Sequence, residues 1–130
     1  MLRVAGARIV TQRTRLSAAD VTSEAEFQAS VLELAHLYGW HVQVHGNERY
    51  SNPGWPDLTL CRDDRLMFWE LKVQDPKKGK ATPAQTAWLN DLAKVSRTNP
   101  GIHAALFRPS DMPRIRELLD ATQLRMEAVG

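Results

Sequence analysis

Three charged residues lie where the surrounding sequence is apolar. Asp57 follows the turn-forming segment NPGWP and opens the apolar run LTL, whereas Glu70 and Lys72 end the run LMFWELK. Burying an unpaired carboxylate is costly, so each of these charges needs solvent or an opposite charge. A Glu-x-Lys pair alone is a weak signal, because an ion pair at the end of a strand explains it as well.

The position of Asp57 strengthens the signal. If residues 57–61 and 66–73 are hairpin strands joined by the turn RDD, Asp57 lies near the C-terminal end of the second strand. The two carboxylates would then converge, and they would repel each other unless a cation lay between them. Oxygen ligands in this arrangement suit Mg²⁺ or Mn²⁺, which also bind phosphate oxygens. Lys72, on the same strand face as Glu70, could orient a water held by the metal or stabilise charge on a phosphate.

The elements that must position these residues follow from periodicity, caps and turn residues. Ser23 with Glu26 and Thr82 with Gln85 each form a capping box at the start of a helix, and Pro83 suits a first helical position. The predicted order is αβββαβα: a helix from Ser23 to Gly39, strands 41–45, 57–61 and 66–73, a helix after Thr82, a strand 102–107, and a last helix opened by PSDMPRIRELL. This order predicts an α/β domain with a mixed central sheet flanked by helices.

Size and composition predict one globular domain. The chain has 130 residues, 43% of them hydrophobic and 25% charged, which is enough to bury a core. No apolar run reaches membrane-spanning length, and we expect no membrane association and no secretory signal. The single cysteine, Cys61, fits a reducing cytoplasm. We therefore expect a cytoplasmic protein.

The basic residues are unevenly distributed, although the net charge of +2 is too small to imply nucleic acid. Residues 1–20 hold four arginines against one acid and are predicted to form a basic N-terminal arm, either a solvated leader or a DNA contact. A second cluster, Lys77, Lys78 and Lys80, follows the Glu-x-Lys strand, and it is either a DNA contact or a solvated excursion.

Three segments carry a resemblance to a known family. GWPDLTL, FWELKV and TPAQTAWL, in this order, resemble the PD-(D/E)xK nuclease superfamily and specifically its VRR-NUC branch. The similarity runs from about Ser23 to about Leu119. It implies a restriction-endonuclease-like core, which we assign to residues 21–130.

The resemblance also implies roles for individual residues. Asp57 and Glu70 match the metal-binding acids, the backbone carbonyl of Leu71 a third ligand, and Lys72 the catalytic lysine. Glu24 matches a first-helix glutamate near the metal, on the inner side of its helix by its spacing to the apolar positions. Its alternative role is to favour the helix N-terminus electrostatically.

Two further matches also have structural alternatives. Gln85 matches a glutamine near the site, and it could equally serve as the cap partner of Thr82. Arg49 resembles a basic residue that faces the phosphate backbone, or it is a solvated loop arginine. Trp55, beside Asp57, either packs in the core or stacks on a base.

The resemblance thus implies an Mg²⁺- or Mn²⁺-dependent DNA endonuclease that acts on branched, flap or Holliday-junction DNA as a homodimer, in a phage or bacterial context. The first alternative is a non-catalytic DNA-binding module that retains the nuclease fold. The second is an unrelated α/β ligand-binding domain in which the motif arose by chance.

Overall fold

A computed structural model describes residues 18–46 and 52–120 of the chain. The elements are α1 (Ala18–Val21), α2 (Glu24–Leu37), β1 (His41–Val44), β2 (Leu58–Arg62), β3 (Arg65–Leu71), α3 (Pro83–Thr98), β4 (Ile102–Phe107), the 3₁₀ turn η2 (Pro109–Asp111) and α4 (Met112–Leu119). The predicted order αβββαβα is confirmed, with the short elements α1 and η2 in addition. Arg49, residues 1–17 of the predicted basic arm, and residues 121–130 lie outside the described residues.

The four strands form one mixed sheet in the order β1-β2-β3-β4. The pairs β1–β2 and β2–β3 are antiparallel, whereas β4 runs parallel to β3. The strand β3 is central, as its apolar residues on both faces predict, and five of its seven residues are buried. The α/β class with a mixed sheet between helices is therefore confirmed.

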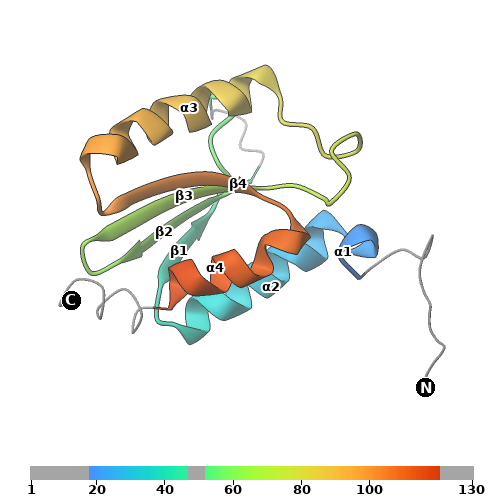
Figure 1. Cartoon of the computed structure of the whole chain (residues 1–130), viewed down its shortest axis with the longest axis horizontal. Helices are drawn as coiled ribbons and strands as arrows, with labels where there is room; N and C mark the ends of the chain where they lie inside the picture. The colour runs from blue at the N-terminus through green and yellow to red at the C-terminus, as the bar shows by residue number, and fades with distance from the viewer. Residues whose placement is uncertain (1–17, 47–51, 121–130) are drawn as a thin grey trace.

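The helices cover the two faces of the sheet unequally (Figure 1). The helices α2 and α4 lie together on one face, where they bury the main hydrophobic core; it includes Phe27, Val31, Trp69, Leu71 and Ile115. On the other face α3 lies alone, and none of its residues is fully buried. Phe68 and Glu70 of β3, and Lys72 directly after it, lie on the side of the sheet that faces α3.

Both predicted capping boxes are present. The Ser23 hydroxyl accepts the Glu26 N–H at 3.1 Å, and the Glu26 carboxylate accepts the Ser23 N–H at 2.9 Å. Thr82 and Gln85 make the same reciprocal pair at the start of α3, with Pro83 as the first helical residue. The caps satisfy backbone donors that a helix start leaves unpaired, which explains why both helices begin at the predicted residues.

The strand that was predicted to span residues 66–73 ends earlier, at Leu71. Its parallel partner β4 ends at Phe107, which is paired with Leu71, so the ladder has no further neighbour beyond this point. One last backbone hydrogen bond, from the Lys72 N–H to the Phe107 carbonyl, closes the strand before the chain turns away. None of the helices within the described ranges is both long and apolar enough to cross a membrane.

Candidate active site

The hairpin of β2 and β3 brings Asp57 and Glu70 together. Leu58 pairs with Trp69 in the antiparallel register, and one further step along the ladder sets Asp57 opposite Glu70. The turn between the strands is tight, and Asp63 adopts a φ of 52° there. Asp57 is then held in place, because its Oδ2 atom accepts the Leu71 N–H at 2.8 Å. The predicted convergence of the two carboxylates is therefore present in the structure.

The two carboxylate oxygens of Glu70 have different surroundings. Its side chain is buried, with the residue only 1% exposed. Oε2 lies 3.3 Å from the Lys72 ammonium nitrogen and accepts a hydrogen bond from the Gln85 amide at 3.0 Å. Oε1 is buried and has no hydrogen-bond partner among the described residues. A buried carboxylate oxygen without a donor is costly, so the ionised form of Glu70 favours a cation beside this atom, whereas the protonated form can share its proton with Asp57.

The electrostatics of Glu70 agree with this view. Burial, with a further contribution from the neighbouring Asp57, raises the pKa of Glu70 to about 7, although Lys72 acts in the opposite direction. In the absence of a cation, the acid therefore tends to hold a proton near neutral pH. A cation between Asp57 and Glu70 would relieve both the burial cost and the repulsion.

Gln85 combines the two roles that the sequence left open. Its Oε1 atom accepts the Thr82 N–H at 2.9 Å, as the capping box requires. The same amide then directs its Nε2 donor toward Glu70 Oε2. The cap therefore determines which end of the amide faces the acid, and the start of α3 becomes part of the site.

A small aromatic cluster supports the segment that leads into Asp57. The Trp55 ring packs edge-on against Trp88 at 4.8 Å, Phe68 at 5.5 Å and His45 at 5.9 Å between ring centroids. These contacts favour the packing role of Trp55 over stacking on a base. They also connect the loop to both the sheet and α3.

The same segment approaches α3 closely at Gly54. This glycine has a φ of +95°, and a Cβ atom added there would lie 2.5 Å from the Ala84 carbonyl group. Only a glycine fits this position, because both its backbone conformation and the available space exclude a side chain. The loop before Asp57 is thus held against the first turn of α3, next to Gln85.

The acid pair suits a divalent cation, although it offers only two carboxylates. Within residues 18–46 and 52–120, no three His, Cys, Asp or Glu side chains cluster closely enough to form a metal site. Mg²⁺ is nevertheless commonly held by one or two carboxylates, with waters and substrate phosphates as its other ligands. Asp57 and the unpartnered Oε1 of Glu70 meet this requirement.

The other predicted site residues are less closely associated with the acids. Glu24 is the first residue of α2 and is exposed, although it shares the helical face of the buried Phe27. Within the described residues it does not form a three-acid cluster with Asp57 and Glu70. Its position in the first turn suits the helix dipole. The carbonyl of Leu71 remains a predicted ligand. Lys77, Lys78 and Lys80 are exposed on the loop between β3 and α3.

Two residues beside the acids were not predicted to belong to the site. The His45 N–H donates to the Asp57 carbonyl at 2.8 Å, and its ring lies 3.3 Å from the Thr59 hydroxyl. The strand pattern HVQVH placed His45 at a strand end, yet the pairing with residue 57 was not visible there. Thr82 acts indirectly, through the cap that orients Gln85.

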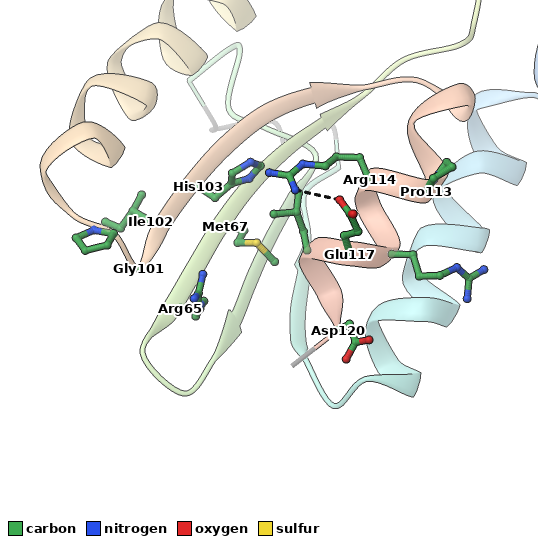
Figure 2. A pocket seen from close by; sticks show the side chains of 12 residues that line it. Arg65, Met67, Gly101, Ile102, His103, Pro113, Arg114, Glu117 and Asp120 are labelled. Atoms are coloured by element: carbon green, nitrogen blue, oxygen red, sulfur yellow. Dashed lines mark hydrogen bonds and ion pairs between the residues drawn. The ribbon is translucent and has the colours of Figure 1, made fainter. Parts of the chain in front are cut away.

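A separate cavity of about 600 Å³ lies between the sheet and α4 (Figure 2). Met67 and His103 contribute to its wall, and Arg114 forms an ion pair with Glu117 at 3.2 Å beside it. Burial, with the nearby Arg114, lowers the pKa of His103, whose Nδ1 atom accepts the Trp69 N–H at 3.0 Å. Met67 belongs to the α2 and α4 face of the sheet, so this cavity lies on the opposite face from Glu70.

Comparisons of the chain with protein-family models, with curated protein sequences and with solved structures find no match.

Proposed function

We propose that the chain is a divalent-metal-dependent DNA endonuclease with a restriction-endonuclease-like core. The observation that supports this proposal best is the cross-strand pair of Asp57 and Glu70, in which a buried oxygen of Glu70 has no partner among the described residues. Most buried carboxylate oxygens have a partner, so a bound cation is a natural occupant of this position in the proposal. The adjacent Lys72 and Gln85 complete a site with the donor types that phosphodiester hydrolysis uses.

In this proposal Asp57 and Glu70 hold Mg²⁺ or Mn²⁺, with the Leu71 carbonyl and Glu24 as further candidate ligands. When bound, the ion supplies Lewis-acid stabilisation of the charge that develops on the phosphate during in-line attack. The acids keep their orientation because the Leu71 N–H holds Asp57 and the Gln85 amide holds Glu70. These hydrogen bonds preorganise the site before the substrate arrives.

Lys72 has a second function in the same proposal. Without substrate its ammonium group pairs with Glu70, and the side chain is only 12% exposed. A phosphate placed over the two acids would offer this ammonium a second anionic partner. Lys72 would then stabilise the additional negative charge of the transition state, which is where a fixed cation contributes most to the rate.

We further propose that the substrate is branched DNA, including flaps or Holliday junctions, and that the active unit is a homodimer in a phage or bacterial cell. The basis is the VRR-NUC resemblance together with geometry: one compact site cuts one strand, and a two-fold dimer would offer two equivalent sites. The exposed Lys77, Lys78 and Lys80, and Arg49 outside the described residues, are the proposed backbone contacts.

The test is cleavage of matched linear, flap, fork and four-way DNA substrates with Mg²⁺ or Mn²⁺. We expect turnover with both ions, faster cleavage of the branched substrates, and none in excess EDTA. Ca²⁺ should support binding with little cleavage, because it coordinates more loosely. Glu70→Gln serves as the matched inactive control.

Each contrary outcome has a distinct meaning. Binding without cleavage under all ion conditions would identify a non-catalytic DNA-binding module. A protein that neither binds nor cleaves DNA would be an unrelated α/β domain. Robust cleavage in EDTA would rule out the metal mechanism.

A further inference from the structure

The loop between β3 and α3 starts directly beside the candidate site and folds back on itself. Its turn is closed by hydrogen bonds from the Lys78 and Gly79 N–H groups to the Asp75 carbonyl, at 3.0 and 2.9 Å. Gly79 is buried, and a Cβ atom added to it would lie 2.7 Å from the Val73 side chain. The end of the loop therefore packs against its own beginning, which argues against a solvated excursion.

Arg108, which follows β4, joins the two ends of this loop. Its Nη1 atom donates to the Val73 carbonyl at 2.6 Å and to the Gly79 carbonyl at 2.9 Å. The residue is half-buried, and the backbone N–H of Arg108 donates in turn to Asp111 at 2.8 Å. A charged donor shared between two carbonyls is a strong contact, so Arg108 holds the two ends of the loop together. We call its hydrogen bonds to the Val73 and Gly79 carbonyls the clasp.

A second anchor lies on the same side. The Gln74 amide donates to the Ser110 hydroxyl at 3.0 Å and accepts the Ser110 N–H at 2.9 Å. Both anchors connect the loop to the junction of β4 and η2, a region of regular structure. The loop is thereby held in one conformation relative to the strand that carries Glu70 and Lys72.

The anchored loop presents three cations. Lys77, Lys78 and Lys80 are all exposed, and within residues 18–46 and 52–120 none of them has an ion-pair partner. Unpaired ammonium groups on a preorganised loop bind a polyanion better than the same groups on a flexible one, because less conformational entropy is lost on binding. The Nη1 donors of Arg108 are already bonded to the Val73 and Gly79 carbonyls.

We propose that Arg108 is a positioning residue for substrate binding: it holds the loop so that Lys77, Lys78 and Lys80 contact the phosphate backbone of DNA next to the Asp57 and Glu70 site. This inference rests on the proposed nuclease function and deepens it. Arg108 sets where the lysines lie and takes no part in the chemical step. Its loss should therefore raise KM and leave kcat unchanged.

The experiment compares Arg108→Met, the triple variant K77Q/K78Q/K80Q and the combination of both. DNA affinity is measured over a salt series in Ca²⁺, and kcat and KM in Mg²⁺. Neutralising the three lysines should reduce the slope of log K against log salt by about 2–3, since each phosphate contact contributes roughly 0.9. Arg108→Met should reproduce much of this loss and raise KM several-fold, and adding it to the triple variant should change little further.

Two controls separate positioning from general damage. Arg108→Lys should retain most of the affinity, because an ammonium can also donate to two carbonyls. Arg97→Gln removes an exposed arginine near the C-terminal end of α3 and should leave the slope within error of the wild-type value. If Arg108→Met fails to fold, as judged by circular dichroism, Gln74→Ala removes the second anchor and should lower the slope in the same way.

The possible results distinguish this inference from the proposed function. Suppose that the triple variant lowers the slope of log K against log salt, whereas Arg108→Met and Gln74→Ala leave the wild-type slope unchanged. The clasp formed by the contacts of Arg108 with the loop then has no role in DNA binding. If Arg108→Met lowers the slope equally in the triple background, Arg108 contacts phosphate itself and is not a positioning residue. If the triple variant behaves as the wild type while cleavage persists, the loop is not a DNA contact, although the nuclease assignment stands. If the wild-type protein neither binds nor cleaves DNA, both the role of Arg108 and the proposed nuclease function are wrong.

Discussion

At the scale of single residues, the two carboxylate oxygens of Glu70 have unequal surroundings. One oxygen is held by Lys72 and Gln85, and the other is buried without a partner among the described residues. Such an arrangement is unfavourable for stability, because desolvation penalises the carboxylate and only one side is compensated. In the proposed function, a bound cation would compensate this second oxygen.

The first prediction concerns the two acids. Glu70→Gln and Asp57→Asn should each reduce metal-dependent cleavage to background, because each removes a carboxylate ligand while conserving side-chain shape. Glu70→Gln should not destabilise the metal-free protein at pH 8, since a neutral amide resembles the protonated acid that the site favours. Cleavage assays and urea unfolding measure the two effects. Activity within a few-fold of wild type in either variant would mean that the site is wrongly assigned.

The second prediction concerns pH. The pKa of Glu70 in the folded protein, about 7, lies above its ordinary value of 4.5, so the native state binds this proton more tightly than the unfolded state. The contribution of Glu70 to the free energy of unfolding is therefore fully present below about pH 4.5. It is lost as the pH rises through about 7, by roughly 1–3 kcal/mol in total.

This pH dependence is measurable as urea unfolding of the metal-free protein between pH 5 and pH 8. Glu70→Gln should flatten the Glu70 contribution to that slope, and Mg²⁺ added at pH 8 should stabilise the wild type more than the variant. A wild-type profile identical to that of Glu70→Gln would show that Glu70 does not retain its proton in the folded protein.

At the scale of elements, the N-terminus of α3 belongs to the site as much as the strands do. Its capping box fixes the Gln85 amide, and the amide in turn fixes one oxygen of Glu70. The capping box of α2 has the same local geometry, but its hydrogen bonds join only Ser23 and Glu26. The two helix starts are thus a natural matched pair.

The third prediction uses this pair. Thr82→Ala and Ser23→Ala should each destabilise the protein by about 1 kcal/mol, the usual cost of losing a cap. Only Thr82→Ala should also lower kcat, because it releases Gln85 and with it Glu70. Thermal unfolding and steady-state cleavage separate the two effects. Equal activity losses in both variants would show that the cap of α3 has no special link to the acids.

The fourth prediction concerns the loop that leads into Asp57. Gly54→Ala should destabilise the fold by about 1–3 kcal/mol, because alanine at a φ of +95° is strained and its Cβ meets the Ala84 backbone. Activity should fall as well, since the loop must move away from α3. Gly46→Ala is the matched control, because a Cβ there meets nothing within 4 Å. A Gly54→Ala variant as stable and active as Gly46→Ala would contradict the close approach.

At the scale of the whole molecule, the sheet separates two different surfaces. The α2 and α4 face holds the main core and the cavity of Figure 2, whereas the α3 face holds the candidate site. Asp57, Glu70, Lys72 and Gln85, the residues of the candidate site, lie on the thinly covered face. That division lets the core supply stability while the other face accommodates charges that reduce it.

The fifth prediction is that the active unit is a homodimer. Resolving a four-way junction requires two symmetric cuts, and the proposed site of Asp57 and Glu70 would supply one cut per copy of the chain. We expect analytical sedimentation to show a dimer at micromolar concentration, at least on junction DNA, and the two cuts to occur at symmetric positions. A monomer both free and bound would favour a flap or nicking nuclease with the same acids.

The sequence by itself determined the local features of this protein. The caps at Ser23 and Thr82, the strand 102–107 and the order of elements were predictable, because each depends on residues a few positions apart. The opposition of Asp57 and Glu70 was also predictable, because a tight hairpin turn fixes the register of its two strands.

Only the tertiary structure decided the rest. The contact of Gln85 with Glu70 and that of Arg108 with Val73 join elements that are distant in sequence, so no local pattern encodes them. The exposure of Glu24 at the first turn of α2 depends on what packs around the helix start, which its spacing to Phe27 and Val31 does not determine. Helical and strand periodicities report which face of an element is apolar, whereas packing alone sets what each polar side chain meets.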